Sequence, residues 1–555
     1  MSFIDYYDKK YVQFICERCN SALSRGYCAI CGRLVCSACS ELIGYARVCK
    51  ICKEKFSITN YEMLKELLKV RADNMDFKQC KLKMIYDKKT EKLGDYIFVA
   101  VGIDDIDSPY GMCTTFAAAN LAYKLLEDVE FLDFPLLVRL NPNIPSKTRG
   151  NAAVALRFRV ESSKFHKIRS LILSTVERFS HSGFRKTNTG VVIYYSNSIC
   201  IPRVFVDFYE LAVKNIVSIN DVFDVLDKMH VGNIEVYDCG NNRGIIGALA
   251  AIGAQFDDWT YELLTYRAST GYDRIVDKTN VISFDKYSKP YTFGNVHKER
   301  ILITPHGLDP VLYGIRGDFP EVLLSGLFLI KSENPVLWCI FRTNQATDTH
   351  INEITNPEDA KPYLTVKISA KVCKILKEDR AIVILARVKE WLIKAYAYEP
   401  MGPVRKIVQK LKTGDVLELT GAVFYQDVFE KIITMNIEKI RFVEIVPEAI
   451  ERNPFCPKCL ARLKSKGRKY LVCPKCGFRI EKTKIIILSA RDIKENSLLL
   501  PPPSAYRHLT KPPEREKIAE MKKHGILKPY LVYPFVGIMK PYYTIKMDVI
   551  QPKIV

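Results

Sequence analysis

The sequence lacks any uninterrupted run of about 18 apolar residues, the length that a helix needs to cross a bilayer. Its first ten residues, MSFIDYYDKK, include acidic side chains and contain no apolar signal region. We therefore expect a soluble, cytoplasmic protein that neither spans a membrane nor is secreted. The chain has 555 residues, and single cores stop growing near roughly 250 to 300 residues, so we also expect several domains.

Acidic residues are scarce relative to basic ones, with 62 Asp and Glu against 83 Lys and Arg, which leaves a net charge of +21. A balance this basic favours a polyanionic partner, because neutralising phosphates releases their counterions. Nucleic acid is the first expectation, ahead of a membrane surface. The alternative is that the lysines only solubilise the surface.

Twelve of the 18 cysteines form pairs separated by two residues, a spacing that lets two thiolates bind one tetrahedral Zn²⁺. In a cytosolic protein, zinc is favoured over disulfides. We expect the six other cysteines to be small buried apolar residues. The pairs are Cys16/Cys19, Cys28/Cys31, Cys36/Cys39, Cys49/Cys52, Cys456/Cys459 and Cys473/Cys476, and the remaining cysteines are Cys80, Cys113, Cys200, Cys239, Cys339 and Cys373.

The last two pairs, with 13 residues between them, predict a zinc ribbon. Residues 458–484 contain ten Lys or Arg and one Glu, which indicates a phosphate-contacting surface or, alternatively, a solvated charged face.

The first eight cysteines have the number of ligands needed for two zinc ions, bound either in series or interleaved. The passage RGYCAICGRLVCSACSELIGYARVCKIC resembles the cross-braced FYVE/RING-like fingers, a treble-clef type. The resemblance implies that pairs one and three share one metal and pairs two and four the other. A basic RHHCR-type patch is missing, so lipid binding is not expected. A probable helix, NYEMLKELLKVRADN, completes a predicted domain over residues 1–90.

Three aspartates follow an apolar, strand-like run in VGIDDIDSPYGMCTT. Asp104, Asp105 and Asp107 repel one another unless a cation lies among them, and carboxylate oxygens are ligands that suit Mg²⁺. Gly111 and Thr114 precede a predicted helix whose free N–H groups suit a phosphate. We therefore predict a site for Mg²⁺ and a nucleotide at the end of a strand. Helix capping with solvent exposure is the alternative.

Two further loops have the composition of phosphate-binding segments. Lys147, Arg149 and Gly150 in NPNIPSKTRGN bring cations to a bend. In NNRGIIGALAAIGA, Arg243 with Gly244 and Gly247 precedes or begins a small-residue helix, which is equally typical of close packing alone.

Residues 361–447 show three strand patterns, a helix and two more strand patterns. This order predicts an OB-fold, a barrel that often binds single-stranded nucleic acid.

Taken together, the motifs VGIDDIDS, PSKTRGN, KTNTG, RGIIGALAAIGA, VLYGIRG, TNQATDTH and PPPSAYRHLTKP follow one another as in the archaeal tRNA 2-agmatinylcytidine synthetases, which the chain closely resembles over roughly residues 95–513. The resemblance implies an ATP-dependent ligase. Members of the family activate the 2-carbonyl of the wobble cytidine in the isoleucine tRNA with a CAU anticodon, by phosphorylating its oxygen, and then attach agmatine.

The resemblance also implies a multidomain α/β and α+β architecture. We expect a kinase-like ATP-binding domain over residues 91–155 and 236–300, entered through a linker near 86–94. A ferredoxin-like domain would cover 156–235 and 301–360, followed by the OB-fold, and then the zinc ribbon and a basic C-terminal tail over 448–555.

By the same resemblance, the three aspartates would hold Mg²⁺ on ATP, and Lys147 and Arg149 would stabilise the transferring phosphoryl group. Thr114 aligns with a threonine that the family phosphorylates. The chain departs from the family pattern at Ile106, Thr189 and Gln345. An agmatine pocket remains unassigned among nearby candidates, which are Asp238, Asp257, Asp258 and Trp259.

Two other functions compete with this one. A nonenzymatic nucleic-acid-binding protein would use the OB-fold and zinc modules and keep the aspartates as a structural metal site. A related ATP-dependent enzyme would use another amine or another RNA. The aspartate cluster argues against the first, since carboxylates repel RNA unless a metal is present.

Overall fold

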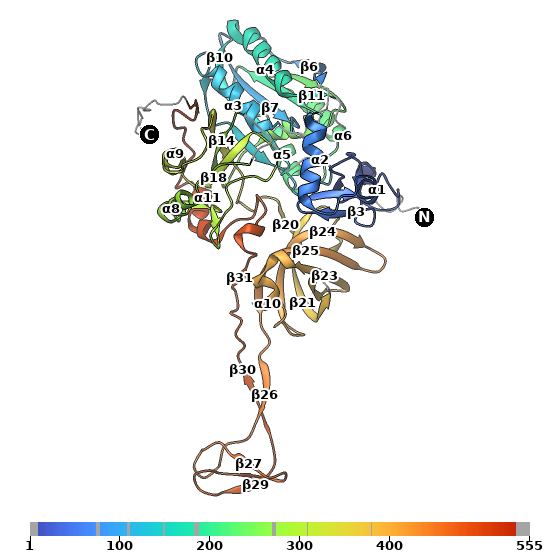
Figure 1. The fold of residues 1–555 in the computed structure, drawn as a ribbon, viewed down its shortest axis with the longest axis vertical. Coiled ribbons are helices and arrows are strands. Elements are labelled where there is room, and N and C mark those ends of the chain that lie inside the picture. The colour runs from blue at the N-terminus through green and yellow to red at the C-terminus, as the bar shows by residue number, and fades with distance from the viewer. Residues whose placement is uncertain are drawn as a thin grey trace. The chain divides into compact units, whose positions relative to one another are not determined.

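A twelve-stranded sheet runs through the first of two units in the computed structural model of the protein (Figure 1). This first unit comprises the chain up to Ile351 and from Pro503 onward, and the second comprises Asn352–Pro502. The structure describes residues 9–73, 78–107, 112–147, 150–182, 188–268, 273–307, 309–378 and 380–539. Among these residues, no helix has both the length and the apolar composition of a membrane span.

Strand β7 (Tyr96–Asp104) lies between β10 (Ala152–Glu161) and β12 (Gly190–Ser196), and it is antiparallel to both. Its odd-numbered residues 97–103 are buried with α3 (Thr114–Leu125) and α4 (Phe165–Phe179). Phe98 and Ala100 are buried with α5 (Arg203–Lys214), α6 (Ile219–Lys228) and α7 (Gly244–Gly253) on the other face. Because helices cover both faces, the strand is apolar throughout and does not alternate.

Helix α7 lies unusually close to the sheet. A methyl carbon built on Gly102 of β7 would lie 1.9 Å from the carbonyl oxygen of Ala248, and one built on Gly244 would lie 2.2 Å from that of Asn188. Side chains at these positions would push the helix away from the strands. The small residues of NNRGIIGALAAIGA therefore serve close packing, the alternative that the sequence left open, and they fix where α7 begins.

The parallel pairing of two strands, β9 (Leu136–Arg139) and β19 (Leu337–Thr343), joins the two halves of this sheet. Strand β9 pairs with β10 on one side and with β19 on the other. Beyond β19 follow β14 (Thr260–Tyr266), β18 (Val311–Gly317) and β15 (Thr292–Phe293), packed with α8 (Lys278–Ser288) and α9 (Pro320–Leu329). One continuous sheet therefore connects residues that the sequence assigned to two interleaved domains, and those predicted boundaries stay a prediction.

At the opposite end of the sheet, β13 (Asn233–Asp238) pairs with β12 and with β6 (Lys83–Lys89). The linker predicted near residues 86–94 is therefore wrong in its first part. The pattern KMIYDKK hides this edge strand, because most of its side chains are exposed or only half-buried and charged residues flank its few apolar ones.

The N-terminal finger, residues 9–73, is built from short elements around two cysteine groups. Its elements are η1 (Lys9–Phe14), β1 (Gly26–Tyr27), β2 (Leu34–Val35), β3 (Ser40–Ile43), β4 (Ala46–Cys49), α1 (Lys50–Lys55) and α2 (Tyr61–Asp73). In each group the sulfur atoms lie within 4.8 Å of one another. The groups are Cys16, Cys19, Cys36 and Cys39, and Cys28, Cys31, Cys49 and Cys52, so the interleaved pairing is confirmed.

The prediction for the isolated cysteines is correct only in part. Cys113 and Cys339 are buried, but Cys200 is exposed and Cys373 is half-buried. Cys80 and Cys239 form a disulfide with their Cα atoms 5.9 Å apart. Cys239 directly follows β13, and a backbone hydrogen bond ties Cys80 to Ser180. The partners are 159 residues apart, so their spacing offers no sequence signal.

The second unit contains a closed barrel of β21 (Thr365–Glu378), β22 (Ala381–Val388), β23 (Trp391–Tyr398), β24 (Val416–Asp427) and β25 (Ile432–Glu444). Helix α10 (Pro403–Val408) lies between β23 and β24 in sequence. Pairing of β21 with β24, and the parallel pairing of β23 with β25, close the barrel. This is the strand order predicted for the OB-fold, which is confirmed.

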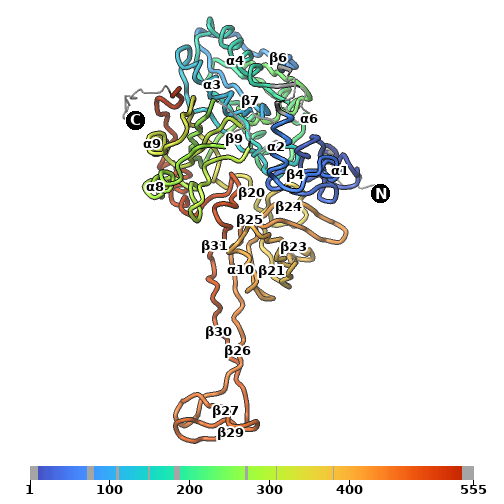
Figure 2. The backbone as a smooth tube through the Cα atoms, in the orientation of Figure 1, coloured from blue at the N-terminus to red at the C-terminus, as the bar shows by residue number. Residues whose placement is uncertain are grey.

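From the barrel the chain leaves through β26 (Glu448–Arg452) and returns through its antiparallel partner β30 (Ile485–Ser489), as Figure 2 shows. Between them, β27 (Lys464–Lys466), β28 (Tyr470–Val472) and β29 (Arg479–Glu481) form a small sheet. The sulfur atoms of Cys456, Cys459, Cys473 and Cys476 lie within 4.8 Å of one another, as a ribbon requires.

The described part of the C-terminal segment, which the sequence grouped with the zinc ribbon, packs into the first unit. Strand β32 (Val536–Ile538) pairs with β19, and Phe535 is fully buried in the core. Before it, α11 (Glu516–Lys523) follows Arg515, whose side chain is 0% exposed. The apolar YPFV motif and this buried arginine explain why the segment packs here.

Arg515 and Lys522 neutralise buried carboxylates. The guanidinium lies 2.8 Å from Asp258 and 2.9 Å from Asp318, and the Lys522 ammonium lies 2.7 Å from Asp318. Lys522 also donates to the carbonyl oxygen of Trp259 at 2.6 Å. These bonds fix the segment to the loops beside β14 and β18.

Replacing Arg515 with Met should destabilise the protein strongly, because it leaves two carboxylates in the interior with too little positive charge. Breaking a buried pair in this way typically costs about 3 to 5 kcal/mol. The matched control is Arg203→Met, which removes an exposed ion pair with Asp207 at 2.7 Å and should cost about 0 to 1 kcal/mol. Urea unfolding of both variants measures the difference, and equal losses would show that the tail is not anchored by this network.

Candidate active site

The three aspartates lie where β7 ends. Asp104 is the last residue of the strand, and Asp105 has a left-handed backbone with φ of +62°. The Asp105 N–H donates to Asp104 Oδ1 at 2.7 Å, and the Asn188 N–H donates to Asp105 Oδ2 at 3.2 Å. A left-handed backbone is uncommon for a residue other than glycine, and here the hydrogen bonds of the surrounding turn hold it.

Both carboxylates are half-buried, and their partial removal from water makes their negative charge costly. Burial, followed by repulsion from Asp105, raises the pKa of Asp104 well above its usual range. Burial raises the pKa of Asp105 to about 7, although the charge of Arg243 opposes this. A divalent cation would offset the same cost, and two adjacent carboxylates form a suitable oxygen ligand set. The residues therefore fit the predicted Mg²⁺ site.

Asp107 interacts with the start of α3. The Thr114 N–H donates to Asp107 Oδ1 at 2.7 Å, and its hydroxyl lies 3.4 Å from the same oxygen. The Ile106 N–H in turn donates to the Thr114 hydroxyl at 3.3 Å. The side chain of Asp107 thus accepts from a free N–H group at the start of α3, as the helix-capping alternative expects. Thr114 is the first residue of the helix, and Cys113 is the N-cap.

Gly247 makes room for Asp104. A methyl carbon at this position would lie 1.9 Å from Asp104 Oδ2, so any larger residue would displace the carboxylate or the helix. The glycine predicted to approach a phosphate thus lies against Asp104 and lines the same cavity, and its contact with a phosphate stays a prediction.

Two of the residues predicted to supply positive charge, Lys147 and Arg243, line one pocket together with Asp104 and Asp105. The Arg243 guanidinium donates to the carbonyl oxygen of Ser146 at 2.8 Å and to the hydroxyl of Tyr27. The Lys147 ammonium donates to the carbonyl oxygens of Pro142 at 2.6 Å and Ile144 at 3.3 Å. Burial lowers the pKa of Lys147 to about 8, and the charge of Arg507 contributes.

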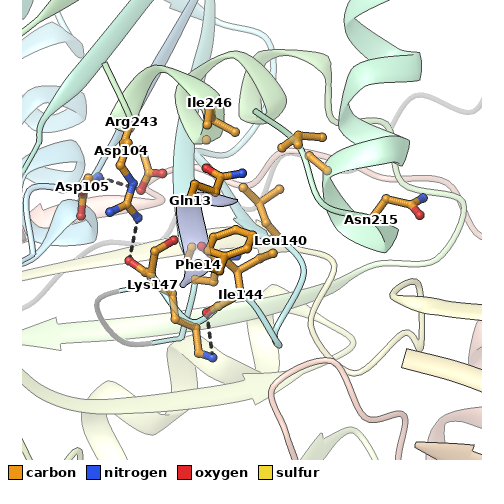
Figure 3. A pocket seen from close by; sticks show the side chains of 16 residues that line it. Gln13, Phe14, Asp104, Asp105, Leu140, Ile144, Lys147, Asn215, Arg243 and Ile246 are labelled. Atoms are coloured by element: carbon orange, nitrogen blue, oxygen red, sulfur yellow. Dashed lines mark hydrogen bonds between the residues drawn. The ribbon is translucent and has the colours of Figure 1, made fainter. Parts of the chain in front are cut away.

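The structure thus brings Asp104, Asp105, Lys147, Arg243 and Gly247 together around one cavity that opens to solvent (Figure 3). The rest of the wall is partly apolar and includes Leu140, Ile144, Val217 and Ile246. A cavity with charged groups beside an apolar wall suits a nucleotide, whose phosphates and base differ in the same way.

Gly150 and Gly244 are not among the residues that line this cavity. Gly150 packs against Arg139 and His508, since a methyl carbon on it would lie 2.4 Å from the Arg139 guanidinium. Gly244 packs on β12 as described above. Gly111 and Arg149 lie outside the described residues.

Asn188, Gln13 and Phe14 carried no clear signal in the sequence, whereas Asp238 was among the agmatine candidates. The Nδ2 atom of Asn188 is buried without a hydrogen-bond partner, beside the turn that holds Asp105. Asp238 is 4% exposed at the end of β13, and burial raises its pKa. Gln13 and Phe14 of the finger line the cavity as well. Of the other agmatine candidates, Asp258 is neutralised by Arg515 and therefore has a structural role.

The three departures from the family pattern are accommodated. Ile106 is 1% exposed in the core beside α3. The Thr189 hydroxyl donates to the carbonyl oxygen of Asp105 at 3.3 Å. Gln345 is fully buried, where its Nε2 donates to Glu262 and its Oε1 lies 3.1 Å from His508 Nδ1.

Comparison with known families gives two matches. Residues 100–238 match the TiaS TCKD domain and residues 242–350 match the TiaS FLD domain. The two matches meet near residue 240, so the cavity is lined from both: by Asp104, Asp105 and Lys147 from the first and by Arg243 and Gly247 from the second.

Relatives of the chain include the isoleucine-tRNA 2-agmatinylcytidine synthetase TiaS of Pyrococcus horikoshii, which is 37% identical over 418 residues, covering 74% of this chain and 96% of that protein. The TiaS of Methanosarcina mazei is 36% identical over 435 residues, covering 76% and 98%. The solved structure of TiaS in complex with this isoleucine tRNA and ATP is similar, with a TM-score of 0.62 and 32% identity over 75% of this chain and 97% of that one. A complex of TiaS with the same tRNA, AMPCPP and agmatine matches with a TM-score of 0.60 and 30% identity, covering 75% and 96%. The chain therefore belongs to the tRNA 2-agmatinylcytidine synthetase (TiaS) family.

Proposed function

We propose that this protein uses ATP to attach agmatine to the 2-carbonyl carbon of the wobble cytidine in the isoleucine tRNA with a CAU anticodon. The residues that line the pocket are the main support for this function. Two half-buried carboxylates, a lysine and an arginine converge there, in a chain that covers 96% of the Pyrococcus horikoshii synthetase. Such a reaction would take place in the cytoplasm, where tRNA is used.

The chemistry requires the cytidine oxygen to leave. A carbonyl oxygen is a poor leaving group, so a phosphoryl group from ATP is first transferred to it. The agmatine amine then attacks the ring carbon, the carbon–oxygen bond breaks, and phosphate departs while the amine loses a proton. The new carbon–nitrogen bond replaces the carbon–oxygen bond.

Asp104, Asp105 and Asp107 would hold Mg²⁺, which supplies charge neutralisation on the ATP phosphates when bound. Lys147 and Arg243 would bind phosphate oxygens, and they reach the cavity from separate loops. We assign Gly111, Arg149 and Gly150 to the same nucleotide site on their positions in the family motifs. Thr114, whose hydroxyl lies beside Asp107, remains our candidate for phosphorylation.

The OB-fold and the ribbon would bind the tRNA. Their basic residues contribute to the net charge of +21, and the ribbon has the composition of a phosphate-contacting surface. We further propose that each of the three four-cysteine groups holds one Zn²⁺, because four converging thiolates form the ligand set of structural zinc.

A nonenzymatic scaffold explains this pocket less well. Binding nucleic acid does not require two adjacent half-buried carboxylates beside a lysine and an arginine, and partly burying their charges without a ligand costs stability. A related enzyme with another amine fits the same pocket and differs only in the product, so the product is what has to be measured.

The test incubates the purified protein with the CAU-anticodon isoleucine tRNA, ATP, Mg²⁺ and agmatine, and measures the mass of the wobble nucleoside. We expect a gain equal to agmatine minus water, and no gain when agmatine is omitted. A different mass gain with another amine would replace agmatine in the proposal. Unmodified cytidine with no ATP turnover would contradict the enzymatic function altogether.

Metal analysis of the purified chain should find three zinc ions. Replacing Cys473 with Ser removes one ligand of the ribbon and should release one of them. The matched control is Cys373→Ser, because Cys373 lies outside the three groups, and it should retain all three. Equal zinc content in the two variants would contradict the ribbon assignment.

A further inference from the structure

The N-terminal finger adds to the family pattern and contacts the rest of the first unit at separate places. Both family matches begin after it, at residues 100 and 242. The Lys10 ammonium lies 3.0 Å from Asp221 on α6. On the other side, the Tyr45 ring stacks on His306 with centroids 4.8 Å apart and an interplanar angle of 4°. Gln13 and Phe14, which lie between Lys10 and Tyr45 in sequence, line the proposed nucleotide cavity.

Gln13 and Phe14, at the end of η1, form part of the cavity wall (Figure 3). Phe14 is 2% exposed, and its carbonyl oxygen accepts a hydrogen bond from the Ser24 N–H at 2.8 Å. Gln13 is exposed toward solvent and donates to the carbonyl oxygen of Lys10 at 2.9 Å. The finger therefore supplies both an apolar and a polar group to a cavity whose other walls come from the catalytic unit.

Tyr27 contacts Arg243 directly. Its hydroxyl accepts a hydrogen bond from the guanidinium, whose central carbon lies 5.8 Å from the centre of the tyrosine ring. The other end of the guanidinium donates to the Ser146 carbonyl oxygen at 2.8 Å. A long arginine side chain has many rotamers, and two fixed acceptors restrict it to one position. That position is at the N-terminus of α7, on the wall of the cavity.

The cysteine groups fix these finger residues in place. Phe14 lies two residues before Cys16, which belongs to one group, and Tyr27 directly precedes Cys28, which belongs to the other. The position of Phe14 therefore depends on the fold of one four-cysteine group, and the position of Tyr27 depends on the fold of the other. The two groups are interleaved along the chain.

We propose that the finger completes the nucleotide site: Gln13 and Phe14 form a wall against the bound nucleoside triphosphate, and Tyr27 is a positioning residue that holds Arg243 toward its phosphates. This inference rests on the proposed ATP-dependent function. It assigns the finger a place in the reaction itself, where the sequence left its partner unknown.

Tyr27→Phe tests the positioning role in the full-length protein, because it removes the hydroxyl and keeps the ring. The affinity for a non-hydrolysable ATP analogue, measured by calorimetry with Mg²⁺, should fall roughly tenfold, the size expected when a hydrogen bond to a charged group is lost. The KM for ATP should rise by a similar factor. The KM for tRNA and the zinc content should not change, whereas an unfolded finger would alter the zinc content.

Gln13→Ala provides a second variant on an exposed side chain that does not endanger the fold, and it should weaken nucleotide binding in the same direction. The matched control is Tyr45→Phe. It makes the same chemical change on the same finger, but its hydroxyl lies 3.5 Å from Arg300 and the residue does not line the cavity. This variant should bind the analogue like the wild type.

Unchanged nucleotide affinity in both Tyr27→Phe and Gln13→Ala would overturn the proposal. Tighter binding in either variant would also overturn it, since the finger would then obstruct the cavity. The binding measurement does not depend on tRNA modification. A wild-type protein that binds the analogue but leaves the tRNA unmodified would therefore refute the proposed function and not the role of the finger.

Discussion

Two half-buried carboxylates lie side by side at the end of β7, and much of the surrounding structure can be understood from the cost of placing their charges there. Asp104 and Asp105 are held by backbone N–H groups and by a turn with a left-handed backbone. Gly247 leaves room for Asp104, and Gly102 lets α7 lie against the strand. The close helix brings Arg243, at its N-terminus, to the same cavity. Strand β7, helix α7 and Arg243 are thus arranged around two adjacent negative charges. A bound metal ion would neutralise these charges.

Much of this architecture could be predicted from local patterns. The uninterrupted apolar run of β7 indicated a strand buried on both faces, and the aspartates that follow it marked the site. The CxxC spacing identified the three four-cysteine groups, because a short knuckle determines where its sulfur atoms point. The strand and helix order identified the barrel. In each case the information lies within a few residues, or in the order of short segments.

The features that the sequence did not reveal depend on contacts between distant residues. The disulfide joins Cys80 to Cys239, and Arg515 pairs with Asp258 and Asp318. Nothing in the neighbourhood of Arg515 distinguishes it from the many surface arginines of a basic chain. The same holds for Tyr27, whose contact with Arg243 crosses more than 200 residues. Strand β6 was missed because it is a half-exposed edge strand, and such strands have weak hydrophobic patterns.

We expect the carboxylates of Asp104 and Asp105, at the end of β7, to bind the Mg²⁺ ion that accompanies the nucleotide. The most direct measurement compares the affinity of wild-type protein and the Asp104→Asn variant for a non-hydrolysable ATP analogue, with Mg²⁺ and with Mg²⁺ chelated. Asparagine has nearly the same shape and lacks the charge. We expect Mg²⁺ to strengthen binding to the wild type and to have little effect on the variant. An equal Mg²⁺ dependence in both proteins would contradict the account.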